Sequence, residues 1–243
     1  MNSEYPSMLG IRKLLPPEKQ FDSYWLRYFL RPISYPITLV FLKLRFSANQ
    51  VSYTAVIVSL LATILMFFES YVFVFSGAIL FNIWAVLDCV DGNVARVRGN
   101  GKTSKYGDFI DAFAGYVVYG FVFLAVGVAT KQSINCVPEY FSRIDFVLVG
   151  AVAAVSNMTM RTIYQHFRNV YGKRIMDTGT SARSLDSNLG ITGLLMPAIL
   201  IGVILCQLHW VILFYALFHV GAFIIVCTKL ILRIENAIKE NTE

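Results

Sequence analysis

Charged residues are scarce in this sequence. Aspartate, glutamate, lysine and arginine together make up 15% of its 243 residues, whereas soluble domains carry about 25% charged residues. Hydrophobic residues make up 56%, and a globular protein of this length has too little interior to bury so many apolar side chains. This composition excludes a disordered chain, a collagen-like repeat and a water-soluble enzyme. It indicates a protein whose main solvent is lipid.

Cysteine is also scarce, and its spacing carries no recognisable site. The four cysteines are Cys89, Cys136, Cys206 and Cys227. They lack the paired spacing of zinc ligands and the density of a disulfide-stabilised scaffold. We therefore expect all four to be small apolar residues of the membrane-embedded part of the chain.

Long apolar runs, in contrast, are abundant. A transmembrane helix needs about 20 mainly apolar residues. Six stretches come close to that length, and they cover 51–68, 71–90, 106–130, 145–164, 189–208 and 210–232. We therefore predict an all-α membrane protein with six transmembrane helices.

The N-terminal segment before these runs mixes prolines, aromatic residues and bases. Within it, residues 21–29 (FDSYWLRYF) interleave apolar and charged side chains at helical spacing, which predicts a juxtamembrane amphipathic helix in the membrane interface. The predicted organisation is a cytoplasmic N-terminal segment over 1–49, a six-helix transmembrane domain over 50–232 and a cytoplasmic tail over 233–243.

Lysine and arginine are distributed unevenly among the predicted connections. Of the 21 lysines and arginines, only Lys131 and Arg143 lie in the connections on one side of the predicted membrane. Because these bases accumulate on the cytoplasmic side, both termini are predicted to be cytoplasmic. The net charge of +6 then describes one rim that faces anionic lipid headgroups, and not a nucleic-acid-binding surface.

Acidic residues gather at the cytoplasmic end of the second and third predicted helices. Asp88 and Asp91 are three residues apart and share a helix face, and Asp108 and Asp111 repeat this spacing on the next helix. Uncompensated carboxylates at a membrane boundary are costly, so the group indicates a bound cation. Hard oxygen ligands favour Mg²⁺ or Mn²⁺ over zinc. The alternative is that the acids only form ion pairs with bases at the same helix ends, which are Arg96, Arg98 and Lys105.

The acids belong to a longer pattern. Residues 88–96 read DCVDGNVAR, and Gly107 and Asp111 follow after a spacer. This pattern resembles the signature of the CDP-alcohol phosphatidyltransferase family, which reads D-x-x-D-G-x-x-A-R, a spacer and then G-x-x-x-D-x-x-x-D. The stretch ANQVS at 48–52 is similar to the P-N-x-x-T sequence that precedes the first span in the family.

The resemblance implies a reaction in which an acceptor hydroxyl attacks the β-phosphorus of a CDP-linked alcohol and CMP leaves. The substrates would be a CDP-alcohol donor and an acceptor alcohol that is either lipid or polar. Asp88, Asp91 and Asp111 would hold the Mg²⁺ or Mn²⁺ ions. The CDP site would be formed by Gly92, Ala95, Arg96 and Gly107.

The family resemblance also implies a homodimer. The third predicted helix contains Gly115, Gly120 and Gly127, and small residues in such a row allow transmembrane helices to pack closely. We therefore expect this glycine face to contribute to packing between two chains.

Two positions depart from the family pattern. The spacer between Arg96 and Gly107 has ten residues where the family usually has eight, which a turn absorbs at modest entropic cost.

At the position of the family's fourth acid, which is assigned to metal binding and to deprotonating the acceptor, this chain has Gly115. Three outcomes stay open. Asp108 supplies the missing carboxylate as a metal ligand and as a catalytic group beside Asp111, or the metal ion itself activates the acceptor hydroxyl, or the chain is a non-catalytic member that binds nucleotide and metal.

Two arginines lie at helical spacing near the cytoplasmic end of the fourth predicted helix. We expect Arg161 and Arg168 to hold a phosphate or another anionic group of the substrate. The alternative is that their side chains only extend to the lipid headgroups.

A cation transporter is the competing function, because acids that face each other between helices also form ion paths. A transporter would place ionisable groups near the bilayer midplane or show inverted repeats with broken helices. In this chain the acids lie at one end of the helices, which favours the phosphotransferase. The sequence does not identify the acceptor.

Overall fold

The computed structural model describes residues 6–16, 22–99, 105–133, 136–171 and 188–240, and all regular secondary structure in these ranges is helical. Its α-helices are α1 (Met8–Lys13), α2 (Arg31–Lys43), α3 (Ala48–Leu65), α4 (Tyr71–Arg98), α5 (Lys105–Gln132), α6 (Phe146–Tyr171), α8 (Met196–Ile204) and α9 (Leu208–Glu240). Short π-helices over Leu26–Leu30 and Ile191–Leu195 precede α2 and α8, and a 3-10 turn covers Glu139–Phe141.

Five of the described helices are long and apolar enough to cross a membrane. They are α3, α4, α5, α6 and α9, which correspond to five of the six predicted spans, so the prediction of an all-α membrane protein is confirmed. The remaining predicted span, 189–208, forms a shorter apolar helix over Ile191–Ile204. This helix begins after Gly190, whose backbone is extended, and ends before the chain turns at Cys206, whose φ is 57°. Within it, Gly193 departs from helical backbone angles. A sixth crossing stays a prediction.

The N-terminal segment is helical over a longer range than predicted. The Ser23 hydroxyl accepts a hydrogen bond from the backbone N–H of Leu26 at 3.2 Å, and the helix continues through Leu26–Leu30 into α2. Arg31, Ser34 and Thr38 are buried polar residues of α2, which packs against α4. Contacts with the bundle therefore hold this helix in place, and its position in the membrane interface stays a prediction.

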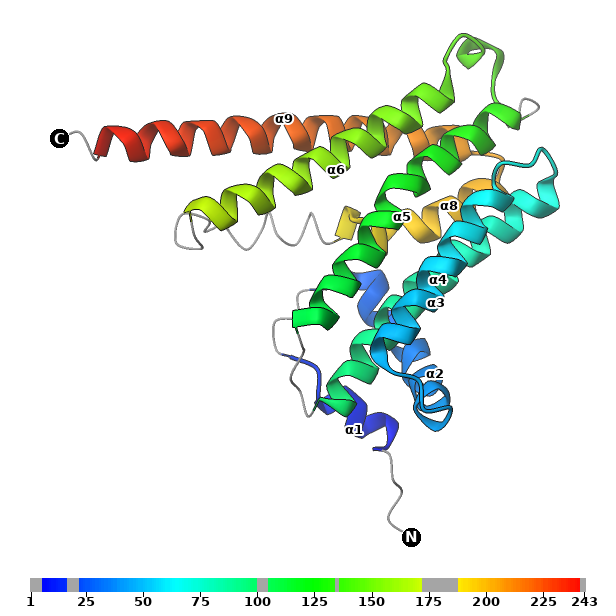
Figure 1. Ribbon diagram of the computed structural model, residues 1–243. Helices are drawn as coiled ribbons and strands as arrows, with labels where there is room; N and C mark the ends of the chain where they lie inside the picture. The colour runs from blue at the N-terminus through cyan, green and yellow to red at the C-terminus, as the bar shows by residue number, and fades with distance from the viewer. Residues whose placement is uncertain (1–5, 17–21, 100–104, 134–135, 172–187, 241–243) are drawn as a thin grey trace.

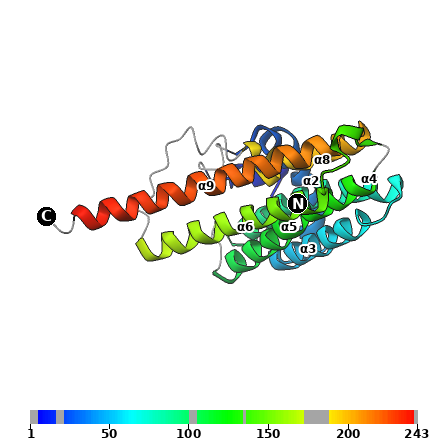
Figure 2. The same cartoon turned by 90° about the horizontal axis from the view of Figure 1, so that it is seen from above.

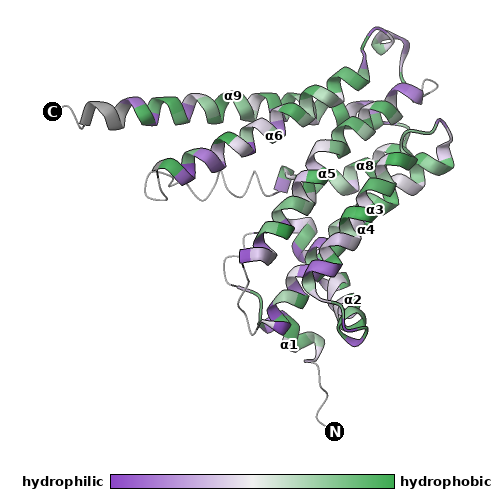
Figure 3. Ribbon diagram, viewed as in Figure 1, coloured by the Kyte–Doolittle hydropathy of each residue, from purple (hydrophilic) through white to green (hydrophobic). Residues whose placement is uncertain are grey.

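The long helices form a bundle around α4 and α6. Helix α4 packs against α2, α3 and α8, while α5 and α9 both pack against α6. Helices α6 and α9 run side by side and extend together beyond the other helices (Figures 1 and 2). The interior contains Phe81, Trp84, Phe123 and Tyr215, each at most 1% exposed. Hydrophobic residues cover much of the length of the helices (Figure 3), as expected where side chains face lipid.

Helices α5 and α6 approach each other closely at glycines. A Cβ atom on Gly127 would lie 2.4 Å from the carbonyl oxygen of Phe146, and a Cβ on Gly150 would lie 2.4 Å from that of Phe123. Near the middle of α5, a Cβ on Gly120 would lie 3.2 Å from the sulfur of Met158. At Gly120 and Gly127 the expected glycine face is thus occupied by α6 of the same chain, so these two glycines give no support to a dimer.

Cys136 and Cys206 form a disulfide bond across 70 residues of sequence. The expectation that all four cysteines are isolated apolar residues is therefore wrong for this pair. Spacing could not reveal the bond because its partners lie in different connections, one after α5 and one between α8 and α9. Cys89 and Cys227 are free, as expected.

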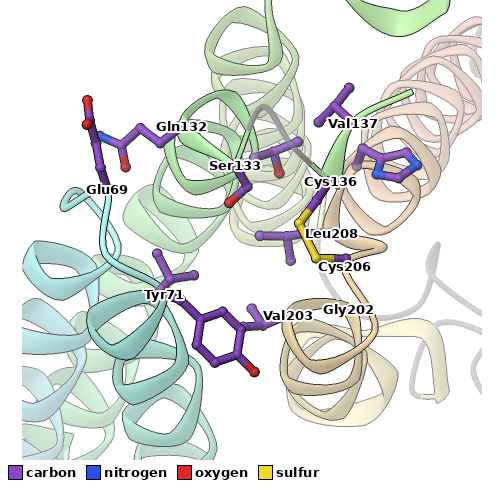
Figure 4. Close-up of a pocket in the computed structure, with 13 residues that line it drawn as sticks. Glu69, Tyr71, Gln132, Ser133, Cys136, Val137, Gly202, Val203, Cys206 and Leu208 are labelled. Atoms are coloured by element: carbon purple, nitrogen blue, oxygen red, sulfur yellow. A yellow bond between two sulfur atoms is a disulfide. The ribbon is translucent and has the colours of Figure 1, made fainter. Parts of the chain in front are cut away.

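The disulfide borders a cavity of about 170 Å³, which Tyr71, Ser133 and Val203 also line (Figure 4). Tyr71 is the first residue of α4, whereas the acidic motif lies at the other end of this helix. None of the predicted site residues lines the cavity, which is therefore not the candidate active site.

Candidate active site

The residues predicted to bind the metal ion and CDP lie where α4 ends and α5 begins. The C-terminal part of α4 carries the first half of the motif, which consists of Asp88, Asp91, Gly92, Ala95 and Arg96. The first turns of α5 carry the second half, which consists of Gly107, Asp108 and Asp111. The structure thus brings both halves to one end of the bundle, away from the disulfide.

Asp91 is the most deeply buried acid of the site. Its side chain is 5% exposed, and its Oδ2 accepts a hydrogen bond from the Ser52 hydroxyl at 2.6 Å. Ser52 belongs to the stretch ANQVS, and α3 begins here because Ser47 and Gln50 form a capping box. The start of α3 therefore places a hydroxyl against the acidic motif of α4.

Two neighbouring carboxylates act on Asp91. The charges of Asp88 and Asp111 both interact with that of Asp91, although Asp88 is half-buried and Asp111 is exposed. Like charges repel more strongly where burial reduces solvent screening, so a bound cation would stabilise the group. Among the residues that the structure describes, no three acidic, histidine or cysteine side chains form a ready-made metal cluster.

Asp108 is exposed and lies in the first turn of α5. A carboxylate at this position stabilises the N-terminus of a helix through the helix dipole. This gives Asp108 a structural reason to be present, besides the catalytic and metal-binding roles expected from the sequence.

Arg96 is held by a polar network that sequence analysis missed. Its Nη2 donates to Asn93 Oδ1 at 2.7 Å, and the Asn93 amide donates to Ser34 Oγ at 3.0 Å and to Thr38 Oγ1 at 3.1 Å. Asn93 is 1% exposed, so the network fixes Arg96 from inside the protein. The available signal was the pair of hydroxyl residues one helical turn apart in α2.

The small residues of the motif leave room for Arg96. A Cβ atom on Gly92 would lie 3.2 Å from Nη1 of Arg96, so glycine allows the guanidinium to lie over the helix backbone. Its buried Nε has no hydrogen-bond partner among the described residues, which leaves a donor for a ligand. Ala95 and Gly107 are both partly exposed at the same end of the helices.

Gly115 lies inside the bundle, next to an aromatic side chain. A Cβ atom on Gly115 would lie 3.3 Å from Cζ and from the hydroxyl oxygen of Tyr119. The Arg161 guanidinium of α6 lies over the Tyr119 ring, 4.4 Å from its centroid, and its Nε donates to Asn157 Oδ1 at 3.1 Å. Position 115, Tyr119 and Arg161 therefore form one contact group.

The two arginines expected to hold a substrate phosphate have different surroundings. Arg161 is half-buried against α5, whereas Arg168 is exposed. Arg168 adjoins Phe167, which packs against Leu230 of α9, on the part of α6 that extends away from α5 (Figure 1). Of these two arginines, Arg161 is the one that contacts Tyr119, next to Gly115.

The chain also matches a known protein family. A family model described as CDP-alcohol phosphatidyltransferase matches residues 45–214, which begin before α3 and end within α9. The matched range contains every predicted site residue. No curated protein sequence matches the chain.

Proposed function

The chain belongs to the CDP-alcohol phosphatidyltransferase family, and on this basis we propose that it moves a phospho-alcohol group from a CDP-alcohol to an acceptor hydroxyl. The bond from the acceptor oxygen to the β-phosphorus forms, the bond from that phosphorus to CMP breaks, and CMP leaves. The observation that carries the proposal is the gathering of both motif halves at one end of α4 and α5, with Asp91 buried against Ser52.

A divalent cation fits the chemistry of the donor set, and the family is generally divalent-metal dependent. Asp88, Asp91 and Asp111 would hold Mg²⁺ or Mn²⁺, since these ions take hard oxygen ligands and the charges of Asp88 and Asp111 both act on Asp91. When bound, such an ion neutralises charge that develops on the phosphoryl group.

The protein's own residues would bind and orient the substrates. Ser52 fixes the Asp91 carboxylate, and Asn93 fixes Arg96, whose guanidinium would contact the CDP phosphates beside Gly92, Ala95 and Gly107. The proton of the acceptor hydroxyl would pass to a carboxylate of α5, either Asp111 or Asp108. Arg161, with Arg168 farther along α6, would attract an anionic group of the acceptor.

Release of CMP tests this function. Purified protein is incubated with CDP-diacylglycerol or another CDP-alcohol, and with glycerol 3-phosphate, inositol 1-phosphate, serine or diacylglycerol as acceptor, with and without Mn²⁺. We expect CMP release that requires both an acceptor and the metal ion. A protein that binds CDP-alcohols but releases no CMP with any acceptor would instead be a non-catalytic member of the family.

The five apolar helices indicate an integral membrane protein, and we propose that both termini and the active site face the cytoplasm. The uneven distribution of lysine and arginine supports this orientation. The disulfide gives independent support, because it lies at the opposite end of α4 from the acids and disulfides persist in oxidising compartments.

A homodimer is proposed from the family alone, and a monomeric mass by light scattering after detergent correction would contradict it.

Cysteine labelling tests the orientation. Lys131 and Lys105 are exposed residues at opposite ends of α5, so Lys131→Cys and Lys105→Cys form a matched pair in a background with Cys89 and Cys227 replaced by alanine. A membrane-impermeant maleimide added to intact cells is expected to label only Lys131→Cys. Labelling of Lys105→Cys under the same conditions would reverse the orientation, and labelling of both after permeabilisation controls for reactivity.

A further inference from the structure

The space at Gly115 is filled by a side chain of the same helix. Gly115 stands where the family signature has its fourth acid, and it is buried. A side chain that began at its Cβ would meet the phenol end of Tyr119 at 3.3 Å. Tyr119 follows by four residues, so it lies one helical turn away on the same face of α5. A polar hydroxyl thus stands where a carboxylate side chain would begin.

Tyr119 is also connected to the rest of the candidate site. The charges of Asp88, Asp111 and Arg161 all interact with its hydroxyl. The Arg161 guanidinium stacks on its ring at 4.4 Å, an arrangement that favours one orientation of the phenol. Asn157 in turn holds Arg161 and contacts His219 of α9. The phenol ring therefore packs against a cationic residue of α6, and the charges of two acids of the site act on its hydroxyl.

We propose that the Tyr119 hydroxyl takes the position of the missing fourth acid and orients the attacking hydroxyl of the acceptor, while Arg161 positions the phenol ring. This assignment rests on the phosphotransferase function proposed above. A phenol both donates and accepts hydrogen bonds, so it can hold an alcohol without changing its own charge. Tyr119 exchanges no proton in this assignment, because the acceptor's proton still passes to a carboxylate of α5.

The geometry also explains why glycine stands at position 115. At 3.3 Å from a ring that Arg161 holds in place, even a methyl group at 115 would push against the phenol. Gly115→Asp alone is therefore expected to displace Tyr119 and to lower turnover. The double variant Gly115→Asp/Tyr119→Ala has room for the carboxylate, and its turnover should exceed that of either single variant.

The main test is Tyr119→Phe, which removes the hydroxyl but keeps the ring on Arg161. The assay is CMP release with CDP-diacylglycerol and whichever of glycerol 3-phosphate, inositol 1-phosphate or serine gives the highest wild-type rate. We expect the KM for that acceptor to rise about fivefold to tenfold, as for the loss of one hydrogen bond, with the affinity for CDP and the unfolding temperature unchanged. Tyr116→Phe is the matched control, because Tyr116 lies on the same helix with its ring 6.1 Å from that of Tyr119, and its KM should stay at the wild-type value.

The outcomes separate this assignment from the proposed function. An active Tyr119→Phe enzyme with the wild-type acceptor KM would overturn the role of Tyr119 and leave the phosphotransferase intact. A wild type that releases no CMP with any acceptor would overturn the proposed function and, with it, the role of Tyr119. A double variant no faster than Gly115→Asp would show that position 115 and Tyr119 do not share one task.

Discussion

Replacing Asp91 by asparagine is expected to abolish Mn²⁺-dependent binding of CDP while leaving the protein folded in detergent. The amide has nearly the shape of the carboxylate and can still accept the hydrogen bond from Ser52. It removes one of three charges that interact at the site. Loss of a partner outside the ligand shell typically costs about 10- to 100-fold in metal affinity, so loss of a ligand is expected to cost more than about 100-fold. Calorimetric titration of CDP with and without Mn²⁺ measures this effect.

Two further variants and a stability measurement complete this experiment. Ser52→Ala should weaken Mn²⁺-dependent CDP binding by about 10- to 100-fold, and Ser52→Thr should retain it because threonine keeps the hydroxyl. Since Asp91 is a buried charge that faces like charges, metal-free Asp91→Asn should unfold at the wild-type temperature or above it. Wild-type CDP affinity in Asp91→Asn would mean that these carboxylates serve structure alone.

Gly127→Ala is expected to lower the free energy of unfolding by about 1–3 kcal/mol, the usual cost of overpacking a tight interior. Its Cβ would lie 2.4 Å from a backbone oxygen of α6, and backbone cannot rotate away as a flexible side chain does. The two helices must separate to make room. Because α5 carries Asp111 and α6 carries Arg161, turnover should fall together with stability. Thermal unfolding in detergent measures the change.

Gly221→Ala is the matched control for this substitution. Gly221 lies in α9, and a Cβ atom there would meet nothing within 4 Å. Alanine is favoured over glycine inside a helix by about 0.5–1 kcal/mol, so Gly221→Ala should unfold at the wild-type temperature or slightly above it. Equal unfolding temperatures for the two variants would show that α5 and α6 do not approach as closely as the structure indicates.

Local sequence signals predicted which segments form the long helices better than they predicted where helices begin and end. Apolar runs identify α3, α4, α5, α6 and α9 because burial in lipid requires long stretches of apolar residues. The same signal overestimated the length of the helix within 189–208, since apolar composition does not reveal that the backbone is extended at Gly190 and turns at Cys206. The amphipathic pattern at 21–29 overlaps a helical stretch that continues to Lys43, and contacts with α4 support this extension. The amphipathic, interfacial character of the helix stays a prediction.

The motif residues of the candidate site could be predicted from the sequence, but the residues that hold them could not. Its acids are close in sequence, and the spacing of Asp88 with Asp91 and of Asp108 with Asp111 predicted that each pair shares a helix face. The partners that hold them come from elsewhere in the chain, as Ser52 does for Asp91 and Asn93 with α2 does for Arg96. A single polar residue within an apolar helix gives no indication of its partner. The disulfide escaped prediction for the same reason, because only the packing of distant connections brings its cysteines together.

The path of the β-phosphorus tests the central claim most directly. A CDP-alcohol labelled with ³²P at the β-phosphate is incubated with Mn²⁺ and each acceptor, and the products are separated. Phospho-alcohol transfer predicts that the label appears in the product that contains the acceptor, in an amount equal to the unlabelled CMP released, and that Asp91→Asn gives none. Label recovered in inorganic phosphate or in the nucleotide, or CMP release without a labelled acceptor product, would contradict the account.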